Sequence, residues 1–217
     1  MIKILSNNNS ILNQYIAEIR DSVIQLDSMR FRRNIEMISE IFAYEISKTL
    51  EYENKEVITP LGSAEVAVLK EFPVLIPVLR AGLPMHRGLQ NIFDKSESAF
   101  ISAYRKVEKN EKFVIKVEYV STPDLTDKVV ILADPMMATG ASIVEVYKEL
   151  KTCGKPSHFH IVVIIASAEG VEFVKKSLPH KEVTLWIGAI DDELTAQAYI
   201  VPGLGDAGDL SFGRKNT

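Results

Sequence analysis

The chain lacks the features that mark secreted, membrane and metal-binding proteins. Among its 217 residues there is one cysteine, Cys153, so an intrachain disulfide is excluded, and no Cys/His cluster has the spacing of a metal site. No uninterrupted apolar run approaches the roughly 20 residues of a membrane span, and the first residues lack the apolar core of a signal peptide. We therefore expect a cytoplasmic protein with no membrane partner.

The chain also lacks an excess of positive charge. It has 25 Lys and Arg residues against 29 Asp and Glu residues, a net charge of -4, so no global positive field attracts nucleic acid. The Gly-Lys-Ser/Thr ending of a Walker loop is missing, and no Gly-x-Gly-x-x-Gly follows an apolar strand. These absences disfavour nucleic-acid partners, ATP chemistry and dinucleotide chemistry. Any anionic ligand must be held by local groups.

The pattern of apolar residues predicts one α/β domain. The length and the hydrophobic content of 47% suit a single core. Apolar residues recur every three or four positions over residues 28–50, which predicts an amphipathic helix. Beyond residue 70, expected strands alternate with helices at 142–152 and 169–178, an order typical of a parallel sheet. The strands are expected at residues 74–79, 99–104, 129–133, 160–166 and 183–187. The predicted fold is a doubly wound, mostly parallel central sheet with an N-terminal helical appendage.

Two segments fit neither a helix nor a core strand. Residues 106–127 are rich in charge, include a hairpin pattern around 113–120 and are too long for a simple connection, which predicts a mobile flap. Residues 201–209 contain Gly203, Gly205 and Gly208. These glycines indicate sharp turns or a close approach of the backbone to another group.

The segment after the strand at 129–133 carries the first functional signal. That strand runs into Asp134, then a short loop at 138–142, then a helix. Ligands bind at the carboxyl ends of parallel strands, where backbone N–H groups and the positive end of a helix dipole form an anion site. Position alone leaves two interpretations open. One is a phosphate site with hydroxyls from Thr139 and Ser142, and the other is a turn at Asp134 with Ser142 as the helix N-cap.

Four motifs, in order along the chain, resemble those of the uracil phosphoribosyltransferases, which belong to the type I phosphoribosyltransferase superfamily. They are Val78-Leu-Arg-Ala-Gly82, Tyr104-Arg105, Asp134-Pro-Met-Met-Ala-Thr-Gly-Ala-Ser142 and Tyr199-Ile-Val-Pro-Gly-Leu-Gly-Asp-Ala-Gly-Asp209. The resemblance covers residues 20–213. It implies transfer of the phosphoribosyl group of 5-phospho-α-D-ribose 1-diphosphate (PRPP) to N1 of uracil, giving uridine monophosphate (UMP) and diphosphate. We expect a single domain over residues 1–217, with an N-terminal helical arm at 1–70, an α/β core at 71–190, a β-hairpin flap at 105–127 and a uracil-binding C-terminal loop at 191–217.

The resemblance also implies roles for individual residues. It makes Arg105, Asp134 and Asp206 the catalytic residues. Uracil has an edge of alternating hydrogen-bond acceptors and donors, which main-chain N–H and C=O groups can match. It is expected to bind at Ile200, Gly205, Asp206 and Ala207. The expected PRPP site consists of Arg80, Arg105, Asp134, Pro135, Met136, Met137, Ala138, Thr139, Gly140, Ala141, Ser142 and Asp206.

The two arginines suit diphosphate, because a guanidinium binds phosphate oxygens with two parallel hydrogen bonds. Without the resemblance, Arg80 and Arg105 could equally be strand-end residues that face water. Lys106 is a further expected contact from the flap. Mg²⁺ is the implied cofactor. It would arrive on the PRPP oxygens, so no metal cage made entirely of protein groups is expected.

The chain departs from the family at one position of the phosphate loop. Members commonly have a second glycine where this chain has Ala141, which fits only if the φ angle of Ala141 stays negative. Two alternative functions remain at this point: a transferase of the same fold that uses another base, and a uridine-nucleotide sensor that binds RNA, against which the acidic balance argues. The family further implies a homodimer or higher homo-oligomer, and GTP as an effector.

Overall fold

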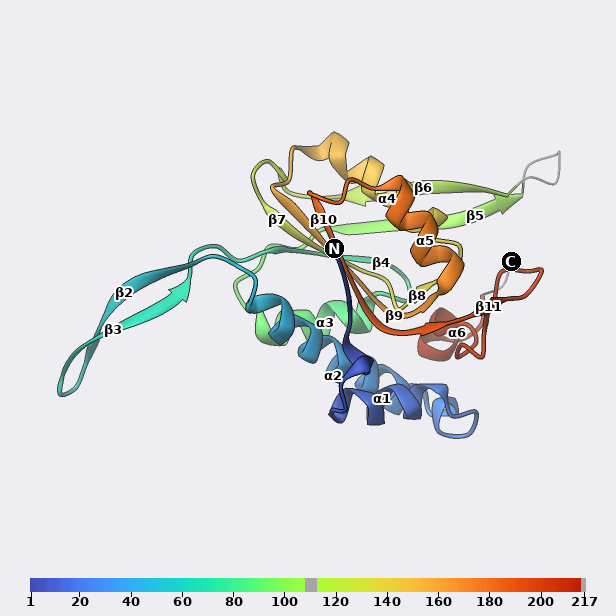
Figure 1. Ribbon diagram of the computed structural model, residues 1–217, viewed down its shortest axis with the longest axis horizontal. Helices are drawn as coiled ribbons and strands as arrows, with labels where there is room; N and C mark the ends of the chain where they lie inside the picture. Colours follow the sequence, from blue (N-terminus) through green and yellow to red (C-terminus); the bar gives the residue numbers. More distant parts are fainter. Residues whose placement is uncertain (108–112, 216–217) are drawn as a thin grey trace.

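The main sheet has a parallel centre and one antiparallel edge. The computed structural model describes residues 1–107 and 113–215, with the backbone alone at 104–107 and 113–114. Within these residues the sheet has eight strands (Figure 1). The order is β1 (Ile2–Ile4), β10 (Val183–Asp191), β9 (His158–Ser167), β7 (Val129–Ala133), β4 (Val74–Leu79), β5 (Phe100–Val107) and β6 (Phe113–Ser121), and β8 (Met136–Met137) pairs with β9. Strands β5 and β6 are antiparallel, and all other neighbouring pairs are parallel.

Helices cover both faces of this sheet, so the domain has three layers (Figure 1). One face is covered by α4 (Ala141–Leu150) and α5 (Ala168–Ser177). The other is covered by α1 (Ile11–Arg20), α2 (Ser28–Ser47) and α3 (Leu83–Ile92), with α6 (Ala207–Phe212) against α2. Among the helices in the described part of the chain, none combines the length and the apolar character needed to cross a membrane.

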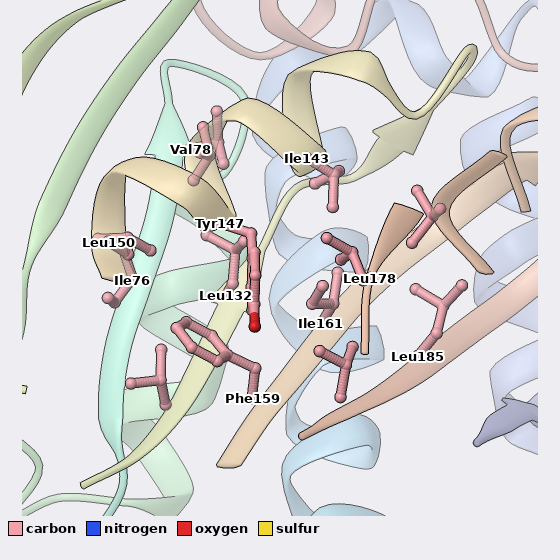
Figure 2. Close-up of a cluster of buried hydrophobic side chains, with 14 of the residues drawn as sticks. Ile76, Val78, Leu132, Ile143, Tyr147, Leu150, Phe159, Ile161, Leu178 and Leu185 are labelled. Atoms are coloured by element: carbon pink, nitrogen blue, oxygen red, sulfur yellow. The ribbon is translucent and has the colours of Figure 1, made fainter. Parts of the chain in front are cut away.

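Coverage on both faces explains why the central strands are apolar at almost every position. Along β7, Val130 and Leu132 lie in the core beneath α4 and α5, whereas Ile131 lies in the core beneath α1, α2 and α3. Successive strand residues point to opposite faces, so both sets must be apolar. Figure 2 shows the first of these cores, in which the rings of Tyr147 and Phe159 pack with centroids 4.8 Å apart. Each large apolar side chain buried in this way stabilises the fold by about 1.5–3 kcal/mol.

The predicted core elements are confirmed, some with longer bounds. β4 and β7 have the predicted bounds, β5, β9 and β10 extend further, and α2, α4 and α5 are the predicted helices. Three helices, α1, α3 and α6, are not predicted from the sequence. For α1 a signal exists, because Ser10 is a helix N-cap that accepts a hydrogen bond from the Leu12 backbone N–H at 3.3 Å.

The region 1–70, expected to be a helical arm, contains strands as well as helices. β1 joins the edge of the main sheet beside β10. β2 (Tyr52–Thr59) and β3 (Gly62–Leu69) form an antiparallel hairpin that turns between Thr59 and Gly62. This hairpin, called the β-arm below, projects away from the domain (Figure 1), and residues 51–67 are all exposed. Strands exposed on both faces need no apolar alternation, so the sequence pattern does not reveal them.

The predicted flap begins as a continuation of the sheet edge. β5 and β6 pair from Phe100 opposite Ser121 to Val107 opposite Phe113, with a register shift between Ser102 and Ala103. The predicted hairpin is therefore present. Residues 108–112 lie outside the described residues, and closure of the flap over a ligand stays a prediction.

Candidate active site

A cleft lies at the carboxyl ends of β4 and β7, where the strand order reverses. β4 and β7 are neighbours, yet the chain continues from β4 toward β5 on one side and from β7 toward β9 on the other. Such a reversal is where parallel α/β sheets bind ligands. The cleft has a volume of about 110 Å³. It is lined by Val78, Leu79, Arg80, Ala81, Ala103, Asp134, Ser142, Asp206, Gly208 and Lys215.

The predicted phosphate loop is tied to the sheet mainly through its carbonyl groups. The carbonyl oxygen of Pro135 accepts hydrogen bonds from the backbone N–H groups of Ile164 at 3.1 Å and Ile165 at 3.0 Å. The carbonyl of Ala138 accepts one from the Ser167 hydroxyl, and the buried side chain of Met137 packs in the core. The loop is therefore fixed from below.

The backbone N–H groups of this loop remain available. Those of Thr139 and Gly140 donate to no group in the described part of the chain. Gly140 is the N-cap of α4, with φ 76° and no side-chain hydrogen bond to the cap, whereas Ser167 caps α5. A methyl group on Gly140 would lie 2.7 Å from Val174 Cγ2. Gly140 has no side chain to cap the helix, and the Ala141 N–H makes a long hydrogen bond to Thr139 Oγ1 at 3.4 Å. This helix end, with the free N–H groups of Thr139 and Gly140, is suited to bind one phosphate-sized anion.

The start of α4 decides between the two interpretations of Ser142 and shows how Ala141 fits. Ser142 lies inside α4, one residue after its start, and its side chain lines the cleft. The interpretation of Ser142 as the helix N-cap is therefore wrong. Ala141 starts α4 and is not among the described residues with a positive φ angle, so its methyl group is accommodated.

Asp134 is half-buried at the floor of the cleft, directly after β7. Desolvation raises the pKa of its carboxyl to about 7, although the backbone N–H of Met136 donates to it at 3.3 Å and acts in the opposite direction. A carboxyl with such a pKa lacks enough donors for its charged form. It is therefore suited to accept hydrogen bonds from a hydroxyl-bearing ligand, and it marks this cleft as a functional site.

Arg80 extends from the end of β4 into the same cleft, where it already has an anionic partner. Its Nη2 lies 3.1 Å from Asp209 Oδ1 and donates to the Gly213 carbonyl at 3.4 Å. Its Nε is buried without a hydrogen-bond partner in the described residues. A ligand anion must therefore compete with Asp209, and the unpaired Nε offers it a donor.

Arg105 and Lys106 lie in β5, where their backbones pair with Ile115 and Val114 of β6. Their side chains lie outside the described part of the structure. The roles predicted for them therefore remain predictions.

The C-terminal loop borders the cleft. Asp206 is the N-cap of α6, where its Oδ1 accepts from the Asp209 backbone N–H at 2.9 Å. Gly205 is exposed with φ 92°. The side chains of Ile200 and Ala207 are buried in the core beneath α1, α2 and α3. Of the predicted uracil-binding residues, Asp206 lines the cleft, and the other three lie in the loop beside it.

The structure thus brings Arg80, Asp134, Ser142 and Asp206 around one cleft, from four segments of the chain. It adds Lys215 to the lining and places Asp209 on Arg80. The acidic side chains three residues apart at 206 and 209 are a helix-start signal that could have indicated α6. No sequence signal indicates Lys215. The described residues contain no group of three or more His, Cys, Asp or Glu side chains placed to hold a metal ion.

A larger hollow, of about 610 Å³, opens at the amino ends of the strands, opposite the cleft, and none of the predicted site residues lines it. Its wall includes His158, His160, Thr184 and Trp186. These groups satisfy one another, since Trp186 Nε1 donates to His160 Nδ1 at 3.0 Å and His158 Nε2 lies 2.9 Å from Thr184 Oγ1. Volume alone therefore does not identify the active site.

Comparison with known proteins gives the same assignment along the whole chain. The model of the family described as uracil phosphoribosyltransferase matches residues 6–214. A uracil phosphoribosyltransferase from Porphyromonas gingivalis is 50% identical over 211 residues, covering 97% of each chain. One from Pyrococcus furiosus is 38% identical over 203 residues, covering 92% of this chain and 85% of the relative. Among solved structures, the AQ2163 protein from Aquifex aeolicus has a TM-score of 0.87, 27% sequence identity and full coverage of both chains.

Proposed function

The chain belongs to the uracil phosphoribosyltransferase family, and from this premise we infer how its residues carry out the family's reaction. The enzyme transfers the phosphoribosyl group of PRPP to N1 of uracil and releases UMP and diphosphate. The matches to uracil enzymes over nearly the whole chain do not favour a same-fold transferase for another base, or an RNA-binding sensor. The remaining proposals concern individual residues, the metal, the assembly and regulation.

The 5-phosphate of PRPP is placed at the start of α4. The observation that carries this proposal is the uncapped helix end, with N–H groups of Thr139 and Gly140 that have no partner in the described residues. The hydroxyls of Thr139 and Ser142 add donors, and Pro135, Met136, Met137 and Ala138 hold the loop in shape. Binding energy from this remote phosphate orients the reacting carbon of the ribose.

Asp134 binds the ribose hydroxyl groups. Its carboxyl is desolvated and, in the described residues, accepts one hydrogen bond, from the Met136 N–H, so hydroxyl donors from the sugar supply what the charged form lacks. This contact fixes the sugar while the bond from its anomeric carbon to diphosphate lengthens. Because positive charge then develops on the ring, a nearby carboxylate also stabilises the transition state.

Arg80 and Arg105 receive the diphosphate. For Arg80 the support is geometric: its Nε is unpaired, and Asp209 holds a nitrogen that diphosphate can take over. Mg²⁺, when bound on the diphosphate, neutralises part of the charge of the leaving group. The carboxylate of Asp206, which lines the cleft, is the group placed to contact the hydrated metal or the ribose. No protein cage is required, since Mg²⁺ keeps several waters.

Uracil binds between the cleft and the C-terminal loop. Main-chain groups of Gly205, Asp206 and Ala207 present donors and acceptors that match the edge of uracil, with Ile200 supporting the loop from the core. Cytosine would place its amino group against a donor, and such a buried mismatch rejects an analogue effectively. Once both substrates are bound, the flap at 105–127 would close and exclude water, which otherwise hydrolyses PRPP.

The active form is a homodimer or higher homo-oligomer, and the β-arm supports this. A hairpin exposed on both faces is marginal in water on its own. This one carries Ile58 at 80% exposure and Leu61 at 101%. A second copy of the chain would cover it. The sequence prediction of a cytoplasmic location suits an enzyme whose substrates are intracellular metabolites.

GTP is proposed as an effector, on the family resemblance alone. Addition of GTP during uracil titrations is expected to raise the rate at subsaturating uracil. An unchanged rate with and without GTP would rule out this regulation.

The direct test is UMP formation from radiolabelled uracil and PRPP, with orotate, hypoxanthine and adenine as competing bases. Uracil alone should be converted, and the activity should depend on Mg²⁺. Turnover of a purine without turnover of uracil would overturn the choice of base.

A further inference from the structure

An ion pair outside the cleft connects the N-terminal helices with the C-terminal loop. Arg20, the last residue of α1, donates from Nη2 to Asp191 Oδ1 and from Nη1 to Asp191 Oδ2, both at 2.8 Å. Asp191 ends β10 and is buried at 7% exposure. Two parallel hydrogen bonds between a guanidinium and a buried carboxylate fix the relative position of the segments that carry them.

Both members of this pair also hold the same loop residue. Arg20 Nη1 donates to the Gly203 carbonyl at 3.0 Å, and the Gly203 backbone N–H donates to Asp191 Oδ2 at 2.9 Å. Gly203 has φ 56°, and a methyl group there would lie 2.2 Å from the Ile200 carbonyl oxygen. The loop therefore makes its sharp turn at Gly203, the residue that is hydrogen-bonded to both members of the ion pair.

Neighbouring contacts from the same helical layer hold the rest of the segment. With its amide oriented to satisfy its surroundings, Gln25 donates to the Leu204 carbonyl at 2.8 Å. Arg32 Nη1 of α2 donates to the Ser211 carbonyl at 2.6 Å, at the far end of the loop and α6. Residues 205–207 lie between these anchors, and Gly205 itself is exposed. Their placement therefore depends on the anchors on either side.

Electrostatics shows that the pair is satisfied in its charged form. Desolvation acts to raise the pKa of Asp191, but the hydrogen bonds from Arg20 and from the Gly203 backbone outweigh it and hold the pKa below its ordinary value. Removing either charged partner would leave the other buried and unpaired.

We propose that Arg20 and Asp191 are a positioning pair for uracil recognition: by fixing Gly203 they set the main-chain groups of residues 205–207 at the edge of the cleft. This inference rests on the proposed role of that loop in binding uracil. In the described structure, neither residue is part of the cleft lining around Asp134 and Ser142. The side chain of Asp206, which is assigned to PRPP, is held separately as the N-cap of α6 by the Asp209 N–H at 2.9 Å, so the pair is expected to act mainly on the base.

The test is steady-state kinetics of Arg20→Lys, with uracil and PRPP varied separately. Lysine keeps the charge, but it cannot bind both carboxylate oxygens and the Gly203 carbonyl in one plane. The KM for uracil should rise about tenfold, because small displacements of a recognition group are costly. The KM for PRPP should stay within about twofold, with kcat little changed when both substrates saturate. Arg20→Ala should raise the KM for uracil further, so that lysine gives partial rescue.

Two further variants separate positioning from general destabilisation. Arg30→Lys is the matched control. Arg30 also makes two hydrogen bonds to a carboxylate, but both go to one oxygen, Glu18 Oε2, from Nε at 2.9 Å and Nη2 at 2.7 Å, and Arg30 has no described contact to the C-terminal loop. It should leave both KM values unchanged. Asp191→Asn should raise the KM for uracil as Arg20→Lys does, and the double variant should show less than the product of the two effects, because the residues act as one unit.

The outcomes are distinct. Wild-type enzyme that makes no UMP from uracil would overturn the proposed function and this inference with it. Normal wild-type turnover, with an unchanged KM for uracil in Arg20→Lys and Asp191→Asn, would overturn the inference alone. The inference would also be overturned if the KM values for uracil and for PRPP both rose in proportion to a fall in melting temperature, since that pattern is expected of a purely structural pair.

Discussion

At the scale of single residues, the candidate active site contains groups whose own surroundings leave them incompletely satisfied. The carboxyl of Asp134 is desolvated, Arg80 has an unpaired Nε, and the N–H groups of Thr139 and Gly140 have no partner among the described residues. Unmet donors and acceptors cost stability in the free protein. A ligand that supplies the missing partners recovers that cost, so each of these residues gives a testable prediction.

Asp134 should make the folded protein less stable as pH rises. Desolvation raises the pKa of its carboxyl from an ordinary value of 3.8 to about 7 in the folded state, so the folded state retains the proton to higher pH. Stability from this group is present below about pH 4 and is lost as pH rises through about 7. Asp134→Asn has no carboxyl to titrate at this position, so it does not suffer this loss. Its free energy of unfolding, relative to that of the wild type, should rise by on the order of a few kcal/mol between pH 4.5 and 8.

Urea denaturation of both proteins at the two pH values measures that gain. The other titrating groups contribute equally to the pH dependence of both proteins, so their contributions cancel when the two are compared. The variant should also lose activity by about 100-fold or more, since it removes the charge beside the developing positive charge of the ribose. A stability difference that is the same at both pH values would contradict the assigned pKa.

Gly140 should be intolerant of a methyl group, whereas Ala141 beside it should tolerate the loss of one. Gly140→Ala places a Cβ 2.7 Å from Val174 Cγ2 at φ 76°, and strain of this kind costs about 1–3 kcal/mol. The phosphate loop should shift, which raises the KM for PRPP. Ala141→Gly restores the family's usual residue and should cost only about 0.5–1 kcal/mol, with the KM for PRPP unchanged. Thermal unfolding and PRPP titrations measure both variants, and equal effects would contradict the assigned geometry.

At the scale of elements, Asp206 at the start of α6 has a structural role as helix cap and a proposed chemical role in the cleft. As N-cap, its side chain accepts from the Asp209 N–H at 2.9 Å, and Asp209 in turn binds Arg80. Asp206→Ala removes the cap, at about 1 kcal/mol, together with the carboxylate that lines the cleft. Asp206→Asn keeps a capping oxygen but removes the charge.

We therefore expect Asp206→Asn to retain the melting temperature of the wild type while losing at least about tenfold in kcat/KM for PRPP. Asp206→Ala should lose both stability and activity. Full activity in the Asn variant would show that the residue serves only to cap α6.

The elements predicted from the sequence are those whose pattern follows from burial. β4, β7 and β9 are covered on both faces, so their continuous apolar runs reveal them, and α2 shows its buried stripe directly. The β-arm is exposed on both faces and gives no such pattern. Contacts between distant segments are also invisible: Arg80 and Asp209 are 129 positions apart, and Arg20 and Asp191 are 171 apart. The resemblance predicts the site residues, but only the fold shows which of them share a cleft.

At the scale of the whole molecule, the β-arm is the part that one chain does not explain. The domain places its apolar residues in two cores, one on each side of the sheet. The β-arm leaves Ile58 and Leu61 exposed at its tip and projects away from the domain (Figure 1). A stable interface between two copies buries about 1,200–2,000 Å² in total, and a projecting hairpin that lies on a second copy contributes to such an area.

The double variant Ile58→Glu/Leu61→Glu should therefore shift the protein toward monomers without unfolding the domain. Two charges at the tip oppose burial against a partner, while residues 51–67 contribute no buried side chain to the domain itself. Sedimentation velocity should show a dimer or larger species for the wild type and a smaller species for the variant, with the far-ultraviolet circular dichroism unchanged. Val23→Glu, at another exposed apolar residue, is the control and should sediment as the wild type does. If the double variant keeps the wild-type sedimentation coefficient, the β-arm does not hold the copies together, and the assembly must use another surface.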